Sequence, residues 1–149
     1  MTPAKRVQIV SLKLVKEGSF LYNIRKLDSP EAAVQLFREF IGTPDREVAV
    51  LLCLDTRNQP MSVQTISVGS LSSSIMHPRE ILKLAVLQSA ASIIVCHNHP
   101  SGDPDPSRED RDVTGRLHEA CEILGIKLLD HIILGDEKRY VSLKERQLM

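Results

Sequence analysis

Four residues in one short stretch have side chains suited to binding a metal ion and assisting a hydrolysis: His97, His99, Ser107 and Asp110. The two histidines stand two positions apart, directly after the apolar run 91–96, which has the length and composition of a buried strand. Side chains at positions i and i+2 of a strand project from the same face of the sheet. Both imidazoles can therefore converge on one point.

Asp110 stands three residues after Ser107, at the start of an expected helix. Because the loop before Ser107 is short and rich in Pro and Gly, Asp110 must lie near the two histidines. Two neutral imidazoles and one carboxylate leave a fourth tetrahedral position open, and this is the ligand pattern of a catalytic zinc. Such a zinc lowers the pKa of its bound water to about 7. The alternative interpretation is a Ser-x-x-Asp helix cap beside a histidine loop without metal.

The remaining elements alternate between strands and helices, which predicts an α/β domain with a mixed sheet flanked by helices. Three helix starts are marked by local signals. Residues 28–31 combine a capping side chain with Pro and an acidic residue, Pro78 is followed by Glu80, and Ser107 is a capping residue. We expect strands at 6–15, 48–54, 61–68, 91–96, 126–134 and 140–143, helices at 28–41, from Pro78 and at 107–124, and a short C-terminal helix.

The composition argues against a dedicated nucleic-acid binder. The chain carries 19 Lys and Arg against 19 Asp and Glu, and it has no Trp, two Tyr and three Phe. A protein that binds the phosphates of DNA is usually basic, and proteins that bind single-stranded nucleic acids stack the bases on aromatic side chains. Residues 1–28 are basic and 103–112 are acidic. We therefore expect at most a weak DNA contact through the N-terminal segment, and a solvated surface strand is the simpler interpretation.

The three cysteines are odd in number and have no CxxC spacing, so no disulfide framework or cysteine-rich metal site is indicated. The N-terminus lacks a signal-peptide pattern, since Lys13 and Lys16 interrupt its apolar residues. Apolar runs such as Val48–Leu54 are too short to span a bilayer. The sequence thus favours a cytoplasmic protein without membrane contact.

The spacing His97-x-His99, seven residues, Ser107, two residues, Asp110 resembles the JAMM motif of MPN-domain metalloproteases. The surrounding segments HPRE at 77–80, HNHPSGDPDPS at 97–107 and LDHIIL at 129–134 resemble the bacterial RadC family in particular. The resemblance covers residues 28–149 and leaves 1–27 as an N-terminal strand and linker. It implies the three-layer MPN fold, which is similar to that of cytidine deaminases.

The resemblance also implies a zinc-dependent peptidase or isopeptidase. In that family the two histidines and the aspartate bind zinc, the serine helps to stabilise the tetrahedral intermediate, and an upstream glutamate is the general base. RadC proteins are associated with DNA repair, and many carry a helix-hairpin-helix region, for which this chain has no room. The rival functions are a non-catalytic module that binds DNA or a repair partner, and a nuclease. Substrate and oligomeric state stay open.

The glutamate is not part of the short motif. Glu47 is the preferred candidate because it opens the buried strand 48–54, fifty residues before His97. Glu80 is the alternative, although Pro-Arg-Glu also reads as the first turn of a helix. His131 lies within an apolar strand, where we expect a satisfied core histidine rather than one that orients a metal ligand.

Overall fold

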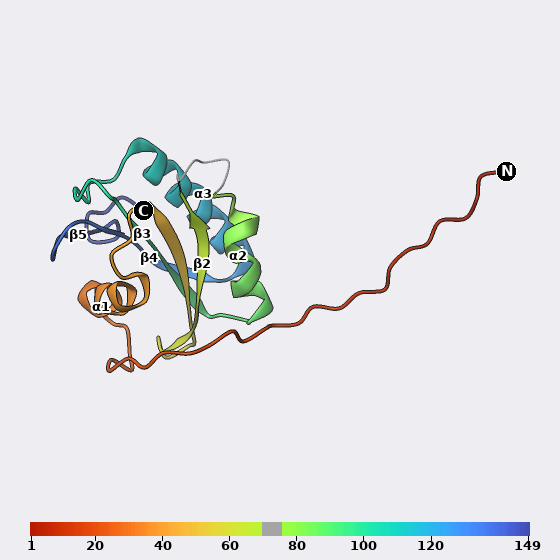
Figure 1. Ribbon diagram of the computed structural model, residues 1–149, viewed down its shortest axis with the longest axis horizontal. Coiled ribbons are helices and arrows are strands. Elements are labelled where there is room, and N and C mark those ends of the chain that lie inside the picture. The colour runs from red at the N-terminus through yellow and green to blue at the C-terminus, as the bar shows by residue number, and fades with distance from the viewer. Residues whose placement is uncertain (70–75) are drawn as a thin grey trace.

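The computed structural model describes residues 1–69 and 76–149, and its elements follow in the order α1, β1, β2, α2, β3, α3, β4, β5 (Figure 1). The helices are α1 (Pro30–Ile41), α2 (Pro78–Leu87) and α3 (Arg108–Leu124). The strands are β1 (Val48–Leu54), β2 (Pro60–Val68), β3 (Ser92–Asn98), β4 (Lys127–Leu134) and β5 (Tyr140–Ser142). The predicted α/β class is confirmed.

The strands form one sheet in the order β2-β1-β3-β4-β5. The β3–β4 pair is parallel and the other pairs are antiparallel, so the sheet is mixed as expected. The strand β1 lies inside the sheet and is buried over nearly its whole length, which explains its continuous apolar sequence. The strand β2 lies at one edge and remains partly exposed.

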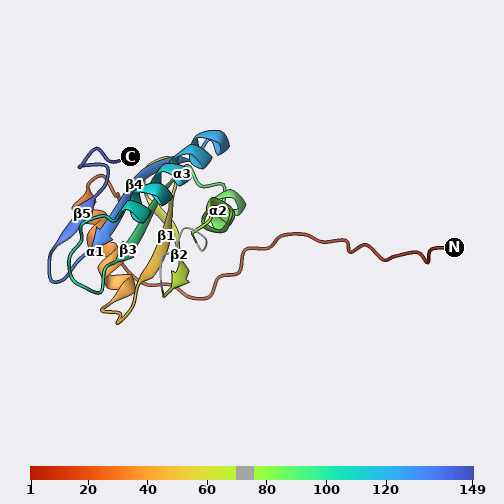
Figure 2. The ribbon, with the colours of Figure 1, turned by 90° about the horizontal axis from the view of Figure 1, so that it is seen from above.

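Alternate residues of the central strands pack on opposite faces, which produces three layers (Figure 2). On one face, Leu52 of β1 packs in the same cluster as Phe37 of α1, which is fully buried. On the other face, Leu51 packs with Ile81 of α2 and Leu117 of α3. His97 of β3 lies on the face that carries α2 and α3, because it follows Ile93 and Val95 at every second position of the strand, and these two residues pack there.

The helix boundaries follow the capping signals of the sequence. The hydroxyl of Ser29 accepts a hydrogen bond from the Ala32 amide at the start of α1, and Gly42 ends this helix at a φ of 68°. Gly125 ends α3 in the left-handed region, at a φ of 70°. Glycine occupies this region without the steric cost that a side chain would add.

Two predicted elements are wrong. Residues 6–15 form no strand, because none of the described strands runs beside them to pair with their backbone. The C-terminal residues form turns instead of a helix: the amide of Leu148 donates to the carbonyl of Leu143, and Gln147 has a φ of 56°. A segment this short gains too few hydrogen bonds to offset helix nucleation, and it closes over Ile133 instead.

The cysteines and the lengths of the helices relate to the expectations about disulfides and membrane spans. Cys53, Cys96 and Cys121 are all buried and unpaired, as small apolar residues of the core. Among the residues that the structure describes, no helix combines the length and the apolar composition required to cross a membrane.

Candidate metal centre

His97, His99 and Asp110 meet where β3 ends and α3 begins. His97 is the penultimate residue of β3, His99 follows the strand, and Asp110 lies in the first turn of α3. His97 Nε2 is 3.1 Å from His99 Nε2 and 3.2 Å from Asp110 Oδ1, and His99 Nε2 is 3.2 Å from Asp110 Oδ2. The structure thus brings together the three residues that the sequence singled out as metal ligands.

The spacing of these donor atoms suits a zinc ion. Zinc–ligand bonds of about 2.0–2.1 Å in tetrahedral geometry separate the ligand atoms by roughly 3.3 Å. The two histidine nitrogens are 3.1 Å apart, close to this value, and each lies 3.2 Å from a different oxygen of Asp110. One ligand atom from each residue thus lies within 4.8 Å of the other two. His97 and Asp110 are buried, and the His99 side chain is only 15% exposed, so the donors need little reorganisation to take up a cation.

A chain of hydrogen bonds fixes the orientation and the tautomer of His97 within the cluster. The Thr114 hydroxyl donates to the Asp110 carbonyl oxygen over 2.7 Å, so it accepts from Nδ1 of His131. Nδ1 of His131 therefore carries its proton, and its Nε2 accepts from Nδ1 of His97 over 2.8 Å. Nε2 of His97 consequently keeps its lone pair, directed at the cluster.

The neutral state of His131 that this chain requires agrees with its surroundings. Burial lowers the pKa of His131 to about 3, and the neighbouring imidazole of His97 acts in the same direction. A neutral imidazole donates with one nitrogen and accepts with the other. His131 is thus both a satisfied core residue and the partner of a candidate ligand, and the sequence-based choice of the first role alone was incomplete.

His99 is oriented by the backbone. Its Nδ1 donates to the carbonyl oxygen of Asp103 over 2.8 Å, which leaves Nε2 free to bind a cation. The Asp110 carboxylate, as hydrogen-bond acceptor, raises the pKa of His99 against the effect of burial, and the negative charge of Glu47 acts in the same direction. Both histidines thus present Nε2 to the same point.

Asp110 belongs to the helix cap and to the cluster at the same time. Its Oδ2 accepts from the Ser107 amide over 2.9 Å, and its own amide donates to the Ser107 hydroxyl oxygen over 3.0 Å. Burial alone would raise the pKa of Asp110, but hydrogen bonds with His97 and His99 outweigh burial and hold this pKa well below its usual range. The capping and ligand interpretations of Ser-x-x-Asp are therefore compatible.

Ser107 is exposed, and its side chain lies at the N-terminus of α3 beside the cluster. The hydroxyl oxygen accepts the Asp110 amide, so the hydroxyl hydrogen is available to donate to another group. Backbone amides at a helix start also favour negative charge. The position suits the stabilisation of an anionic oxygen.

Glu47 directly precedes β1 and lies close enough to His99 for its charge to act on that imidazole. The β1–β3 pairing ends at Ala49 and His97, so Glu47 and His99 each lie two residues beyond the last pair, at the same end of the two strands. Glu47 is half-buried, and its charge raises the pKa of His99, which puts its carboxylate within electrostatic reach of the cluster.

Asn98 holds the backbone on both sides of Glu47. Its Oδ1 accepts from the Val48 amide over 2.7 Å, and its Nδ2 donates to the Arg46 carbonyl over 3.1 Å. The amide of Gly69 also donates to the Glu47 carbonyl over 2.7 Å. The middle residue of the His-Asn-His triplet thus fixes the segment that carries the candidate general base.

Glu80 lies in a different environment. It stands in the first turn of α2, is exposed, and forms an ion pair with Lys83 over 2.8 Å. Hydrogen bonding to Lys83 lowers the pKa of Glu80, and the further charges that affect it, Arg79 and His77, lie on or next to the same helix. The geometry therefore favours Glu47 over Glu80 as the carboxylate that serves the cluster.

Sequence reasoning missed Thr114 and gave His131 too little weight. The Asp-His pair inside an apolar strand was a signal, since a buried polar side chain requires a partner. Thr114 gave no comparable signal, because threonine is common within helices, where it bonds to the preceding turn.

The three-layer fold with its mixed sheet and the His-His-Asp cluster define an α/β domain with a candidate metal site. A family model described as "RadC-like JAB domain" matches residues 27–148. The chain therefore belongs to the RadC-like JAB domain family.

Curated relatives support this assignment. A UPF0758 protein of Clostridium acetobutylicum is 46% identical over 149 residues, which cover 98% of this chain and 65% of the relative. One from a Geobacillus species is 51% identical over 145 residues, covering 95% and 64%. One from Desulforamulus reducens is 53% identical over 120 residues, covering 80% and 52%. The chain thus spans between half and two thirds of these relatives.

Proposed function

We propose that this chain is a zinc-dependent metallohydrolase that cleaves a peptide or isopeptide bond. The observation that carries the proposal is the cluster of three oriented donor atoms, His97 Nε2, His99 Nε2 and a carboxylate oxygen of Asp110, with the charge of Glu47 within reach of His99. These residues would hold the ion and leave a position open for water or substrate, as catalytic zinc sites do.

When bound, zinc supplies Lewis-acid polarisation of the scissile carbonyl and lowers the pKa of the attacking water. Glu47 accepts a proton from that water as its oxygen bonds to the carbonyl carbon. The carboxyl group of Glu47 then returns the proton to the departing amine as the C–N bond breaks. The Ser107 hydroxyl donates a hydrogen bond to the carbonyl oxygen as it becomes negative.

The first experiment measures zinc and hydrolysis together. Elemental analysis of protein dialysed without chelator should give about one zinc per chain, because two histidines with fixed tautomers and one carboxylate bind zinc tightly. Cleavage is followed with a fluorogenic peptide library that contains ordinary peptide bonds and lysine isopeptide bonds. Wild-type protein with bound zinc should cleave members of this library, and removing zinc with a chelator should stop cleavage.

Matched glutamine variants then test the roles. Glu47→Gln should retain zinc and reduce cleavage by a factor on the order of 100 or more, because a general base is not a ligand. Glu80→Gln should retain both the bound zinc and the cleavage activity. Loss of zinc from Glu47→Gln would contradict its assignment as a base, and an inactive Glu80→Gln would move the base to α2. Zinc-containing protein that cleaves no library member but hydrolyses a phosphodiester would support the nuclease alternative.

A further inference from the structure

The N-terminal arm, defined here as residues 1–20, exposes large apolar side chains that a folded protein normally buries. Val7 is 91% exposed, Ile9 is fully exposed and Leu12 is 83% exposed. The segment forms no helix or strand, and both views show it leaving the body of the domain as an extended chain (Figures 1 and 2). Such a run of apolar side chains in water is unfavourable, so a covering surface is expected.

The sequence of the arm is that of a strand. Residues 6–15, Arg-Val-Gln-Ile-Val-Ser-Leu-Lys-Leu-Val, consist mainly of β-branched and leucine residues and contain no Gly or Pro. An isolated strand of this kind is unstable in water, because its backbone and side chains have no partner. The prediction of a strand at 6–15 was wrong for the single chain, but its chemical basis remains.

The body of the domain exposes a surface that matches the arm. The strand β2 ends the sheet, and among the described residues no further strand pairs with its outer edge. Beside this edge lies a groove of about 1780 Å³, lined by parts of β2, α2, the end of α3 and residues 12–20. Met61, Val86 and Ile123 line it and are all exposed. An open strand edge beside apolar side chains favours pairing with another strand.

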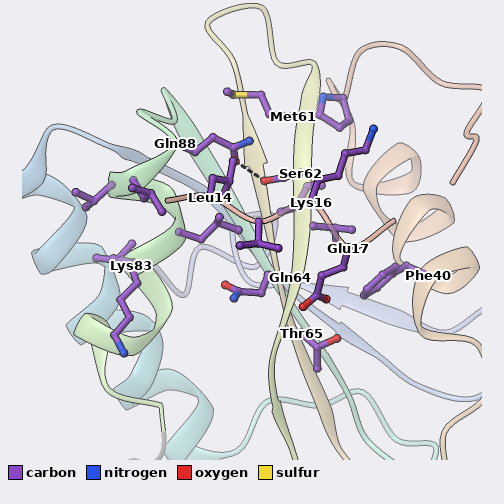
Figure 3. A pocket seen from close by; sticks show the side chains of 18 of the residues that line it. Leu14, Lys16, Glu17, Phe40, Met61, Ser62, Gln64, Thr65, Lys83 and Gln88 are labelled. Carbon is purple, nitrogen blue, oxygen red and sulfur yellow. Dashed lines mark hydrogen bonds between the residues drawn. The ribbon is translucent and has the colours of Figure 1, made fainter. Parts of the chain in front are cut away.

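Within its own chain the arm crosses β2 without pairing with the outer edge of this strand. Phe20 packs on Phe40 of α1, with ring centroids 5.7 Å apart, which fixes the base of the arm. From there the chain crosses β2 near Lys16 and Leu14, toward α2, instead of running along the strand (Figure 3). Residues 1–11 then lie away from the body (Figures 1 and 2). A second copy offers the same unpaired edge.

We infer that two copies of this chain exchange their arms, so that residues 6–15 of each copy pair with the free edge of β2 in the other. Each sheet then gains a sixth strand, and the apolar side chains of the arm cover the exposed residues of β2, α2 and α3. A reciprocal exchange closes with twofold symmetry and leaves neither edge open. The alignment with the Clostridium acetobutylicum relative covers 98% of this chain, so it includes the arm.

The oligomeric state of the full chain tests this inference by size-exclusion chromatography with multi-angle light scattering over a concentration series. Wild-type protein should have the mass of a dimer. Leu12→Glu should weaken the dimer by at least about 10-fold, because the dimer would bury the new charge. Leu21→Glu is the matched control: Leu21 is 96% exposed, lies outside residues 6–15, and should leave the dimer unchanged.

The receiving surface is tested separately with Val86→Glu, a change at a half-exposed residue of α2 that should also weaken the dimer. Mixing Leu12→Glu with Val86→Glu should produce dimers that contain one copy of each, because the unaltered arm of the Val86→Glu copy then meets the unaltered groove of the Leu12→Glu copy. Circular dichroism should show that all three variants remain folded, since each altered side chain is exposed in the single chain. A monomeric wild type, a dimer insensitive to Leu12→Glu, or variants that gain nothing on mixing would each overturn the exchange.

Discussion

The metal centre and the N-terminal arm differ in how far the single chain satisfies their interactions. In the metal centre, His97, His131 and Thr114 form a continuous series of hydrogen bonds that ends on the backbone of Asp110. In the arm, apolar side chains such as Ile9 contact mainly solvent. The comparison indicates that the site is organised before any ligand arrives, whereas the arm acquires a defined structure only with a partner. The following predictions test each side of this difference.

The largest expected effect is on metal affinity. Asp110→Asn should weaken zinc binding by more than about 100-fold, because it removes the only negative charge among the ligands, and loss of outer partners alone costs 10–100-fold. The asparagine can still accept from the Ser107 amide, so the helix cap should survive. Asp112→Asn, at an exposed position of the same helix, is the matched control. Zinc competition titrations measure both, and equal losses would contradict the assignment.

Asn98→Ala should affect stability and activity together. It removes both hydrogen bonds that hold the partly exposed backbone beside Glu47, so the free energy of unfolding should fall by about 1–3 kcal/mol, at roughly 0.5–1.5 kcal/mol for each hydrogen bond. Urea denaturation measures this loss. Zinc should stay bound while cleavage slows, because Asn98 contacts the segment of the general base and not the ion. Unchanged cleavage in a correctly folded variant would show that the hydrogen bonds of Asn98 do not position Glu47.

A smaller effect is expected from Thr114→Val, which keeps the side-chain shape but removes the hydroxyl between His131 and the Asp110 carbonyl. His131 then loses the acceptor that fixes its tautomer, and zinc affinity should fall by about 10-fold. Thr65→Val, at an exposed position of β2, should leave the affinity unchanged. Equal zinc affinity of Thr114→Val and wild type would show that the hydrogen-bond series does not orient His97.

The smallest effect concerns DNA. Duplex binding should be weak and salt-sensitive, because the net charge is zero and the loop at 103–112 is acidic. Replacing Lys13 and Lys16 with Gln should reduce the slope of log affinity against log salt concentration by up to about 1.8 in magnitude. The same change at Lys127 and Lys138 should leave it unaltered. Fluorescence anisotropy measures both slopes, and tight binding at physiological salt would favour the DNA-binding alternative.

Local chemistry made much of the fold and of the cluster predictable. The caps at Ser29 and Ser107 and the glycine at Gly42 mark helix ends through interactions within a few residues. His97 and His99 share a face because that follows from strand geometry alone. Such features depend on neighbours in sequence, so the sequence contains their cause.

The remaining features depend on pairing between distant segments. Glu47 comes near His99 because β1 pairs with β3 in the register that places Ala49 beside His97, and a shift of one residue would turn the side chains of β1 to the other face of the sheet. His131 meets His97 because β4 lies parallel to β3, which the sequence indicated only as a mixed sheet. The strand expected at 6–15 failed for the same reason, since pattern alone does not supply a partner.

The three buried cysteines have a consequence for chemical labelling. Burial raises the pKa of Cys53 and Cys121 to about 11 and that of Cys96 well above its usual value. The thiolate is the form that attacks alkylating reagents and peroxide, so all three thiols should stay inert in the folded protein. A single cysteine introduced into the exposed arm would therefore react selectively with a maleimide dye, with no need to remove the native cysteines.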